Sequence, residues 1–273
     1  MIKQAIIPLA GQGTRLLPLT SVLPKELLPI NGKPGIEYII DECINSGIKE
    51  IIFIISKNKN IIKKYFYNDS FYKKIIKKKK NDKRLKFEYS KIKKYKKMIK
   101  FVYQNSPRGT GDAVLRCKKF IKSEYFLMLM PDDLIINANC SKSIIKLHNI
   151  YKSSIIASKK VNKKNVSRWG IFDIKKISKR NFIIKDVIEK PKIKSAPSNY
   201  AVIGRYVLPK KIFKFLKNQK PGKNGEIHIT DSIRSLLHDN NKFIGHIFAG
   251  KYLDCGTMKG YINSTIEISK LKL

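Results

Sequence analysis

Short apolar runs alternate with amphipathic segments along the first half of the chain. Residues 50–55 are almost continuously apolar, which is typical of a strand buried on both faces of a parallel sheet, and residues 3–9 also predict a short buried strand. Residues 34–46 predict a helix that starts at a proline and ends before a glycine. The same pattern predicts strands at 99–104, 125–130 and 153–158 and helices at 58–67, 111–120 and 141–151. This alternation indicates an α/β fold with a mostly parallel sheet.

Strands become more frequent than helices after residue 158. We expect strands at 170–174, 182–189, 200–207 and 242–248, and helices at 209–217, 229–239 and 257–270. The Lys-rich stretch 73–97 predicts a solvated helix and loop inserted into this order. No internal repeat and no Ser- or Pro-rich linker divides the sequence, so we expect residues 1–273 to form a single domain.

The net charge of +38 invites the hypothesis of nucleic-acid binding, because lysines neutralise phosphates. Only eight of the 58 basic residues are Arg, which base-specific readers prefer, and the lysines are spread along the whole chain. Codon drift toward an AT-rich genome explains the composition better. We therefore expect no nucleic acid as a primary partner, although the charge should attract anionic metabolites to any cleft.

Cysteine spacing and hydropathy exclude further classes of protein. The four cysteines form no C-x-x-C pair, which argues against a zinc site. No run approaches the roughly 20 apolar residues of a membrane span, and the first residues lack the features of a signal peptide. We expect a cytoplasmic protein with no membrane partner and with free thiols.

A glycine-rich loop, residues 11–15 (GQGTR), directly follows the first predicted strand. Ligands of open α/β sheets bind beyond the carboxyl ends of strands, and Gly11 and Gly13 let the backbone approach a phosphate. Leu16 stands where a dinucleotide fingerprint needs a third glycine, and the Gly-Lys-Ser/Thr end of a Walker loop is absent. Taken alone, the loop could also be an ordinary turn after a strand.

Two prolines stiffen the segment 24–29 (PKELLP) around a lysine and a glutamate. A Lys held within reach of the first loop would give the site a second fixed positive charge. Lysine is common throughout this chain, so the signal comes from the spacing between Lys25 and Arg15.

With these two segments the sequence resembles the sugar-phosphate nucleotidyltransferases, and Pro-Lys-Glu in place of Pro-Lys-Pro resembles the bacterial UTP–glucose-1-phosphate uridylyltransferases. The resemblance continues in register to near the C-terminus. The matching segments are residues 11–18, 24–29, 102–104, 108–114, 130–133, 169–170, 189–191, 199–206, 225–231 and 254–256. Any one of these motifs could arise by chance, but their common order makes chance a poor explanation.

The resemblance implies a Rossmann-like three-layer fold with a central mixed, mostly parallel sheet. A nucleotide-binding half would span about residues 1–158 and a sugar-binding half about 159–273. The implied reaction joins UTP and glucose 1-phosphate to give UDP-glucose and pyrophosphate, with Mg²⁺ as cofactor. The relatives form dimers and tetramers, so a homo-oligomer is implied as well.

The resemblance also assigns roles to individual residues. Arg15 and Lys25 would be catalytic, and Asp132 and Asp254 would hold the metal. The nucleotide would be bound by Ala10, Gly11, Gly13, Glu26, Gln104 and Gly109. The sugar phosphate would be bound by Gly170, Glu189, Lys190 and Gly204, with Arg205 as a reserve phosphate contact.

The chemistry of two of these residues, Asp132 and Gln104, agrees with their roles. Asp132 ends a buried apolar run, where a carboxylate is costly unless it is paired or bound to metal; capping a helix is its alternative role, and Asp133 next to it is a candidate for a structural role. Gln104 offers a donor and an acceptor in one amide, as the edge of uracil does.

Three rival functions remain open at this point. A thymidylyltransferase or another nucleotide-sugar pyrophosphorylase would share the fold. A nucleotide-binding regulatory protein without turnover is disfavoured by the presence of Arg15, Lys25, Asp132 and Asp254 together. A basic nucleic-acid-binding protein is disfavoured by the composition.

Overall fold

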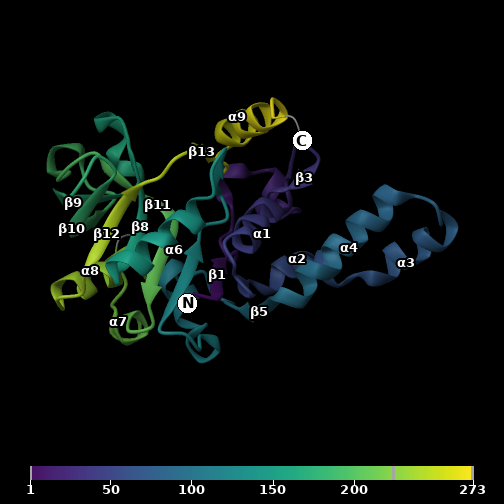
Figure 1. Ribbon diagram of the computed structural model, residues 1–273, viewed down its shortest axis with the longest axis horizontal. Coiled ribbons are helices and arrows are strands. Elements are labelled where there is room, and N and C mark those ends of the chain that lie inside the picture. The colour runs from purple at the N-terminus through teal and green to yellow at the C-terminus, as the bar shows by residue number, and fades with distance from the viewer. Residues whose placement is uncertain (1, 223–224, 272–273) are drawn as a thin grey trace.

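A nine-stranded sheet runs through the centre of the protein in the computed structural model, which describes residues 2–222 and 225–271 (Figure 1). The strand order is β5-β4-β1-β6-β11-β8-β12-β10-β9. The strands are β1 (Gln4–Pro8), β4 (Glu50–Ile55), β5 (Ile99–Tyr103), β6 (Tyr125–Leu129), β8 (Ser154–Lys160), β9 (Gly170–Lys176), β10 (Asn181–Glu189), β11 (Tyr200–Pro209) and β12 (Phe243–Ile247). Each coincides with an expected strand to within two residues at either end.

The directions of the strands confirm a mixed, mostly parallel sheet. Neighbours β5, β4, β1 and β6 are all parallel, and so are β8 and β12. Strand β11 is antiparallel to both β6 and β8, and β10 is antiparallel to both β12 and β9. Within this sheet only β10 and β11 therefore run against the other strands.

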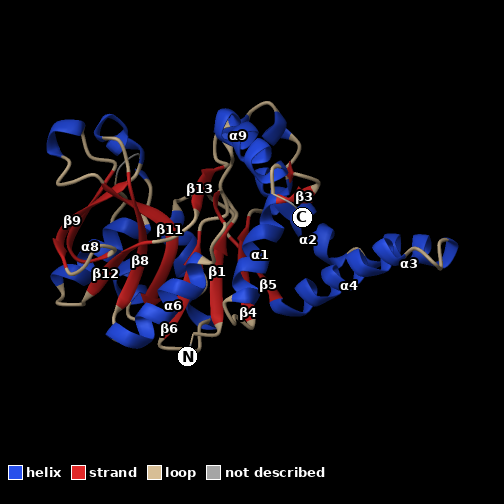
Figure 2. Cartoon of the chain, turned by 45° about the horizontal axis from the view of Figure 1, so that its top comes forward, coloured by secondary structure: helices blue, strands red, loops and turns tan. Residues whose placement is uncertain are grey.

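Helices cover both faces of the sheet, which confirms the three-layer architecture (Figure 2). Alternate residues of β1 show the division, because Ala5 and Ile7 belong to one hydrophobic cluster and Ile6 to the other. The first cluster contains α1 (Gly35–Asn45), α2 (Asn60–Tyr67) and α6 (Cys140–Tyr151). The second contains α5 (Thr110–Leu115), α7 (Ile212–Asn218) and α8 (Ile229–His238). Helix α9 (Met258–Ser269) follows at the end of the chain.

The Lys-rich insertion is a pair of helices, α3 (Asp69–Lys78) and α4 (Lys83–Met98), that projects away from the body of the protein (Figure 1). The two helices are held together by the stacked rings of Tyr72 and Tyr89 and by an ion pair between Lys96 and Asp69. The expected solvated insertion is thereby confirmed, with more helix than loop. None of the helices in the described part of the chain is both long and apolar enough to cross a membrane.

Two small antiparallel sheets were not expected from the sequence. One pairs β2 (Pro29–Ile30) with β3 (Lys33–Pro34), and the other pairs β7 (Asp133–Ile136) with β13 (Lys251–Asp254). In the second sheet Asp133 lies opposite Asp254. This pairing carries the end of the chain back to the carboxyl end of β6.

A buried ion pair joins α1 to β11. The guanidinium of Arg205 on β11 is fully buried and contacts both carboxylate oxygens of Glu42 on α1 at 2.8–3.1 Å. Its remaining N–H groups donate to the carbonyl oxygens of Met130, Gly204 and Asp133. Burial alone would raise the pKa of Glu42, but Arg205 lowers it below its usual range.

Candidate functional site

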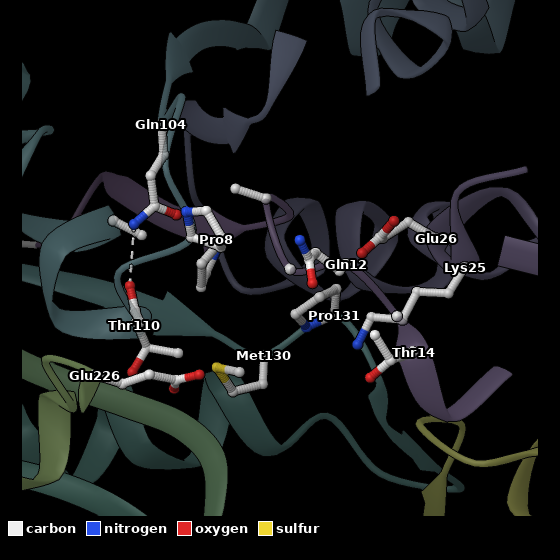
Figure 3. Close-up of a pocket in the computed structure, with 16 residues that line it drawn as sticks. Pro8, Gln12, Thr14, Lys25, Glu26, Gln104, Thr110, Met130, Pro131 and Glu226 are labelled. Atoms are coloured by element: carbon white, nitrogen blue, oxygen red, sulfur yellow. Dashed lines mark hydrogen bonds between the residues drawn. The ribbon is translucent and has the colours of Figure 1, made fainter. Parts of the chain in front are cut away.

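A pocket of about 250 Å³ opens at the carboxyl ends of β1 and β6. Its walls come from segments 8–14, 25–26, 104–113 and 130–131 and from Glu226, which are far apart in the sequence. Figure 3 shows Gln104, Thr110 and Glu226 on one side and Gln12, Thr14 and Lys25 on the other. The pocket therefore lies where open α/β sheets bind ligands, and it contains Ala10, Gly11 and Gly13 as expected.

Glycine stands at the two loop positions, 11 and 13, for different physical reasons. A Cβ at Gly11 would meet nothing within 4 Å, so this backbone faces open space. Gly13 adopts φ +72°, a left-handed conformation that favours glycine, and begins the short 3-10 helix η1 (Thr14–Leu16). Thr20 fixes this turn by donating to the Gly13 carbonyl at 2.8 Å. Arg15 extends from η1 with 62% of its side chain exposed.

Lys25 is held against Asp132 at the floor of the site. The Nζ–Oδ2 distance is 2.7 Å, and Arg15 approaches the same oxygen at 3.8 Å. Burial alone would lower the pKa of Lys25, but Asp132 and then Glu26 raise it above its usual value. Burial would likewise raise the pKa of Asp132, but Lys25 lowers it. Both groups are therefore charged at neutral pH.

Asp132 and Asp254 face a common point beside Gly256. A Cβ at Gly256 would lie 2.8 Å from Oδ2 of Asp132, 3.1 Å from Oδ1 of Asp254 and 3.0 Å from Nη2 of Arg15. The backbone N–H of Cys255 also donates to the Asp132 carbonyl at 2.8 Å. The expected pair of metal ligands is thus brought together by the unexpected β7–β13 sheet.

The two carboxylates fit the preferences of Mg²⁺, which needs only one or two carboxylates when substrate phosphates and water supply its other ligands. The described residues contain no cluster of three or more His, Cys, Asp and Glu side chains, which a dedicated protein cage would require. Asp132 precedes strand β7, so its alternative role as a helix cap is wrong.

Asp133 is structural. Its Oδ2 accepts the N–H of Gly204 at 2.9 Å, and its Oδ1 accepts the hydroxyl of Tyr252 at 2.7 Å. Burial and the neighbouring Asp132 carboxylate raise the pKa of Asp133 to about 6. Its bond to β11 holds the segment that carries Asp132 on the main sheet, and its bond to Tyr252 joins that segment to β13.

Gln104 lines the pocket at the end of β5, with its amide nitrogen already engaged. Nε2 donates to Asp112 Oδ2 at 2.7 Å and to the Gly109 carbonyl at 3.1 Å. Among the described residues Oε1 accepts no hydrogen bond, so the acceptor of the amide is available to a ligand. The sequence analysis matched both the donor and the acceptor of the amide to uracil. In the structure the donor is already bonded to Asp112 and Gly109.

Gly109 lines the same pocket, but the close approach of another segment explains why it is glycine. It adopts φ +95°, and a Cβ there would lie 2.6 Å from the Ile227 carbonyl oxygen. Backbone hydrogen bonds join Ile227 to Arg108 and Gly111. This contact brings Glu226 into the wall of the pocket. The motif 225–231 signalled the segment, although no role had been assigned to Glu226.

Glu26 lines the pocket, but its carboxylate forms a buried ion pair. Lys59 Nζ contacts its two oxygens at 2.8 and 3.0 Å and also donates to the Leu9 carbonyl at 2.7 Å. Burial lowers the pKa of Lys59, and Glu26 partly offsets this effect. Lys59 thus ties the segment 24–29 to the end of β1. Nothing in the sequence distinguished it from the other lysines.

Three of the expected sugar-binding residues meet at the paired ends of β9 and β10. Glu189 lies opposite Gly170, and a Cβ at Gly170 would come within 3.3 Å of Glu189 Oε2. Lys190 Nζ lies 3.4 Å from Glu189 Oε1, and its N–H donates to the Trp169 carbonyl. The three lie outside the walls of the 250 Å³ pocket.

Gly204 and Arg205 are packed inside the protein. A Cβ at Gly204 would lie 2.4 Å from the Cβ of Met130, so close packing against the residue that follows β6 explains this glycine. Arg205 is fully buried against Glu42, and the expectation of a phosphate contact for it is wrong. A guanidinium that is paired and enclosed on all sides cannot reach a substrate.

Known proteins are similar to this chain in both sequence and structure. The sequence matches the model of the nucleotidyl transferase family over residues 4–270. It is 37% identical to the UTP–glucose-1-phosphate uridylyltransferase of Bacillus subtilis, over 98% of this chain and 91% of that protein. The structure is similar to a UDP-glucose pyrophosphorylase complexed with UDP-glucose (TM-score 0.87, 35% identity, 99% of both chains). It is also similar to the UTP-bound enzyme of Acinetobacter baumannii (TM-score 0.88, 32% identity, 98% of this chain and 93% of that chain).

Proposed function

The chain belongs to the nucleotidyl transferase family, and we propose that it transfers a uridylyl group from UTP to glucose 1-phosphate, giving UDP-glucose and pyrophosphate. The observation that carries the proposal is the convergence of Arg15, Lys25, Asp132 and Asp254 beside Gly256. Proteins named for this activity are similar to the chain over nearly its full length, and one similar structure is a complex with UDP-glucose. A regulatory protein without turnover would not need this set of charges.

The reaction is an in-line attack of the sugar-phosphate oxygen on the α-phosphorus of UTP. The nucleophile is already ionised near neutral pH, so no general base is required. Catalysis then reduces to positioning and to stabilising the charge on the transferring and leaving phosphates. Loop amides at Gly11 and Gly13 hold the nucleotide, and the cations of Lys25 and Arg15 stabilise the phosphates. Mg²⁺ held by Asp132 and Asp254 would add further positive charge there when bound.

Base recognition rests on Gln104. Its Oε1 would accept the N3–H of uracil, because its amide nitrogen is held by Asp112 and Gly109. Thymine presents the same N3–H, so this contact does not separate UTP from dTTP. Discrimination must come from the space around the C5 position of the base or from contacts with the ribose 2′-hydroxyl, which dTTP lacks.

A panel of substrates tests the proposed function. Pyrophosphate release would be measured with each nucleoside triphosphate crossed against glucose, galactose and N-acetylglucosamine 1-phosphates. We expect kcat/KM to be highest for UTP with glucose 1-phosphate, by about tenfold or more over dTTP, which carries an extra methyl group and lacks the 2′-hydroxyl. A preference for dTTP would support the thymidylyltransferase instead.

Glu189→Gln is expected to raise the KM for glucose 1-phosphate about tenfold, because the neutral amide loses the charge-assisted hydrogen bonds of the carboxylate to sugar hydroxyls. The KM for UTP should stay near its wild-type value, since Glu189 lies outside the pocket around Gly11. Initial-rate kinetics with each substrate varied in turn would check both values. An unchanged KM for glucose 1-phosphate would remove Glu189 from the sugar site.

Two properties complete the proposal. We propose a homo-oligomer, which the resemblance implies, in the cytoplasm, which the hydropathy favours. UTP and glucose 1-phosphate are the proposed partners, since the composition disfavours nucleic acid as a primary partner. Sedimentation at several protein concentrations would test the oligomer.

A further inference from the structure

Arg168 lies between Asp254, a proposed metal ligand, and the sugar-binding stretch, by which we mean Gly170, Glu189 and Lys190. It is the last residue of the short 3-10 helix η6 (Lys163–Arg168), directly before Trp169 and Gly170. Its guanidinium lies 4.8 Å from the centroid of the Trp169 ring, and its Nη2 contacts Asp254 Oδ2 at 2.8 Å. A half-exposed arginine thus reaches across to strand β13.

The contact fixes the second oxygen of Asp254. Oδ1 accepts the backbone N–H of Gly256 at 2.9 Å and faces the point shared with Asp132. Oδ2 is held by Arg168. With one donor on each oxygen, the carboxylate has a single orientation, in which Oδ1 is directed toward Asp132.

The same arginine is anchored on the sugar side. The guanidinium contacts the ring of Trp169, and the backbone carbonyl of Trp169 accepts the N–H of Lys190 at 3.0 Å. The next residue, Gly170, lies opposite Glu189. The chain of contacts therefore runs from Glu189 and Lys190 through Trp169 and Arg168 to Asp254. It joins two groups of residues that come from separate segments.

We propose that Arg168 is a positioning residue that orients Asp254 for divalent-metal binding and couples this carboxylate to the sugar-binding stretch. The proposal rests on the proposed function, which makes Asp254 a metal ligand. Two effects of Arg168 oppose each other. Its charge repels a metal ion, but the side chain of Arg168 is 48% exposed and solvent screens its charge. Its hydrogen bond fixes the ligand, and the loss of such a partner typically weakens metal binding by about 10–100-fold.

Binding of Mn²⁺ measures the effect without turnover. Mn²⁺ prefers the same oxygen ligands as Mg²⁺ and can be titrated by electron paramagnetic resonance. With UDP-glucose present and pyrophosphate absent, no reaction can proceed. We expect Arg168→Gln to raise the dissociation constant of Mn²⁺ about tenfold. Arg168→Lys, which keeps a cationic donor, should recover part of the loss.

Arg234 provides a matched control. It forms an ion pair with Asp186 at 2.8 Å, and the side-chain exposures of that pair, 46% and 23%, nearly equal the 48% and 23% of Arg168 and Asp254. Neither Arg234 nor Asp186 lines the pocket. Arg234→Gln changes the net charge equally, so its Mn²⁺ affinity should stay at the wild-type value.

The outcomes separate the two claims. Wild-type protein that binds no Mn²⁺ in this complex would overturn the metal site of the proposed function and the role of Arg168 with it. Wild-type binding that Arg168→Gln leaves unchanged would overturn the positioning role alone. Tighter binding in Arg168→Gln would show that Arg168 competes with the metal, which is the opposite of the proposal. Circular dichroism of each variant would confirm that it is folded.

Discussion

Replacing Lys25 with methionine is expected to lower kcat by roughly 10³-fold, because a fixed cation beside the transferring phosphates stabilises charge that develops in the transition state. The structure gives this lysine one position, with its Nζ 2.7 Å from Asp132 and its ammonium enclosed in the site. Its raised pKa keeps it charged throughout the neutral range. Single-turnover measurements with saturating UTP and glucose 1-phosphate would isolate the chemical step.

The same replacement has a second consequence, for stability. It leaves the buried carboxylate of Asp132 with Arg15, at 3.8 Å, as its remaining cation. Breaking a buried pair from one side costs up to about 3–5 kcal/mol. Unfolding by urea would therefore be measured alongside the rates, with assays run well below the unfolding midpoint. Lys33→Met removes a lysine that forms a partly exposed pair with Asp41 and serves as the control. A kcat within tenfold of wild type for Lys25→Met would sink its catalytic role.

The main sheet could be predicted because its strands carry local signals. Residues 50–55 and 125–129 are nearly continuous apolar runs, and burial on both faces is what such runs require. The β7–β13 sheet carries no such signal. Its strands are four residues long and pair across more than 110 residues of chain, so their pairing is decided by tertiary contacts.

The candidate site shows the same division. The resemblance in the segments 11–18 and 24–29 led to Gly11, Gly13 and Lys25, which the structure brings into one pocket. The environments of individual side chains could not be predicted from the sequence, because partners that are distant in the sequence determine them. Arg205 lies within the matching segment 199–206, but its burial depends on Glu42, 163 residues away. The role of Lys59 likewise depends on Glu26 and on the Leu9 carbonyl.

The largest effect on stability is expected from Glu42→Gln. The change leaves the guanidinium of Arg205 fully buried without a counter-charge, and an arginine cannot be neutralised by losing its proton. Breaking such a pair from one side typically costs about 3–5 kcal/mol, which for a chain of this size lowers Tm by roughly 10 °C. Differential scanning calorimetry at neutral pH would measure the shift.

A double replacement shows whether the lost stability comes from the unpaired charge. Glu42→Leu combined with Arg205→Met removes both charges and fills a similar volume, so it should recover most of the stability lost by Glu42→Gln. Asp239→Asn breaks the exposed pair with Lys211 and should leave Tm unchanged.

Lowering the pH should reduce the difference in Tm between wild type and Glu42→Gln. Arg205 lowers the pKa of Glu42 in the folded state, so the stabilisation is fully present above the unfolded Glu pKa of about 4.3 and is lost as pH falls through the folded value. The difference in Tm between wild type and Glu42→Gln should therefore be constant when it is measured between about pH 6 and 8. It should shrink below about pH 4. A gap that grew in acid would mean that Glu42 is not the ionised partner of Arg205.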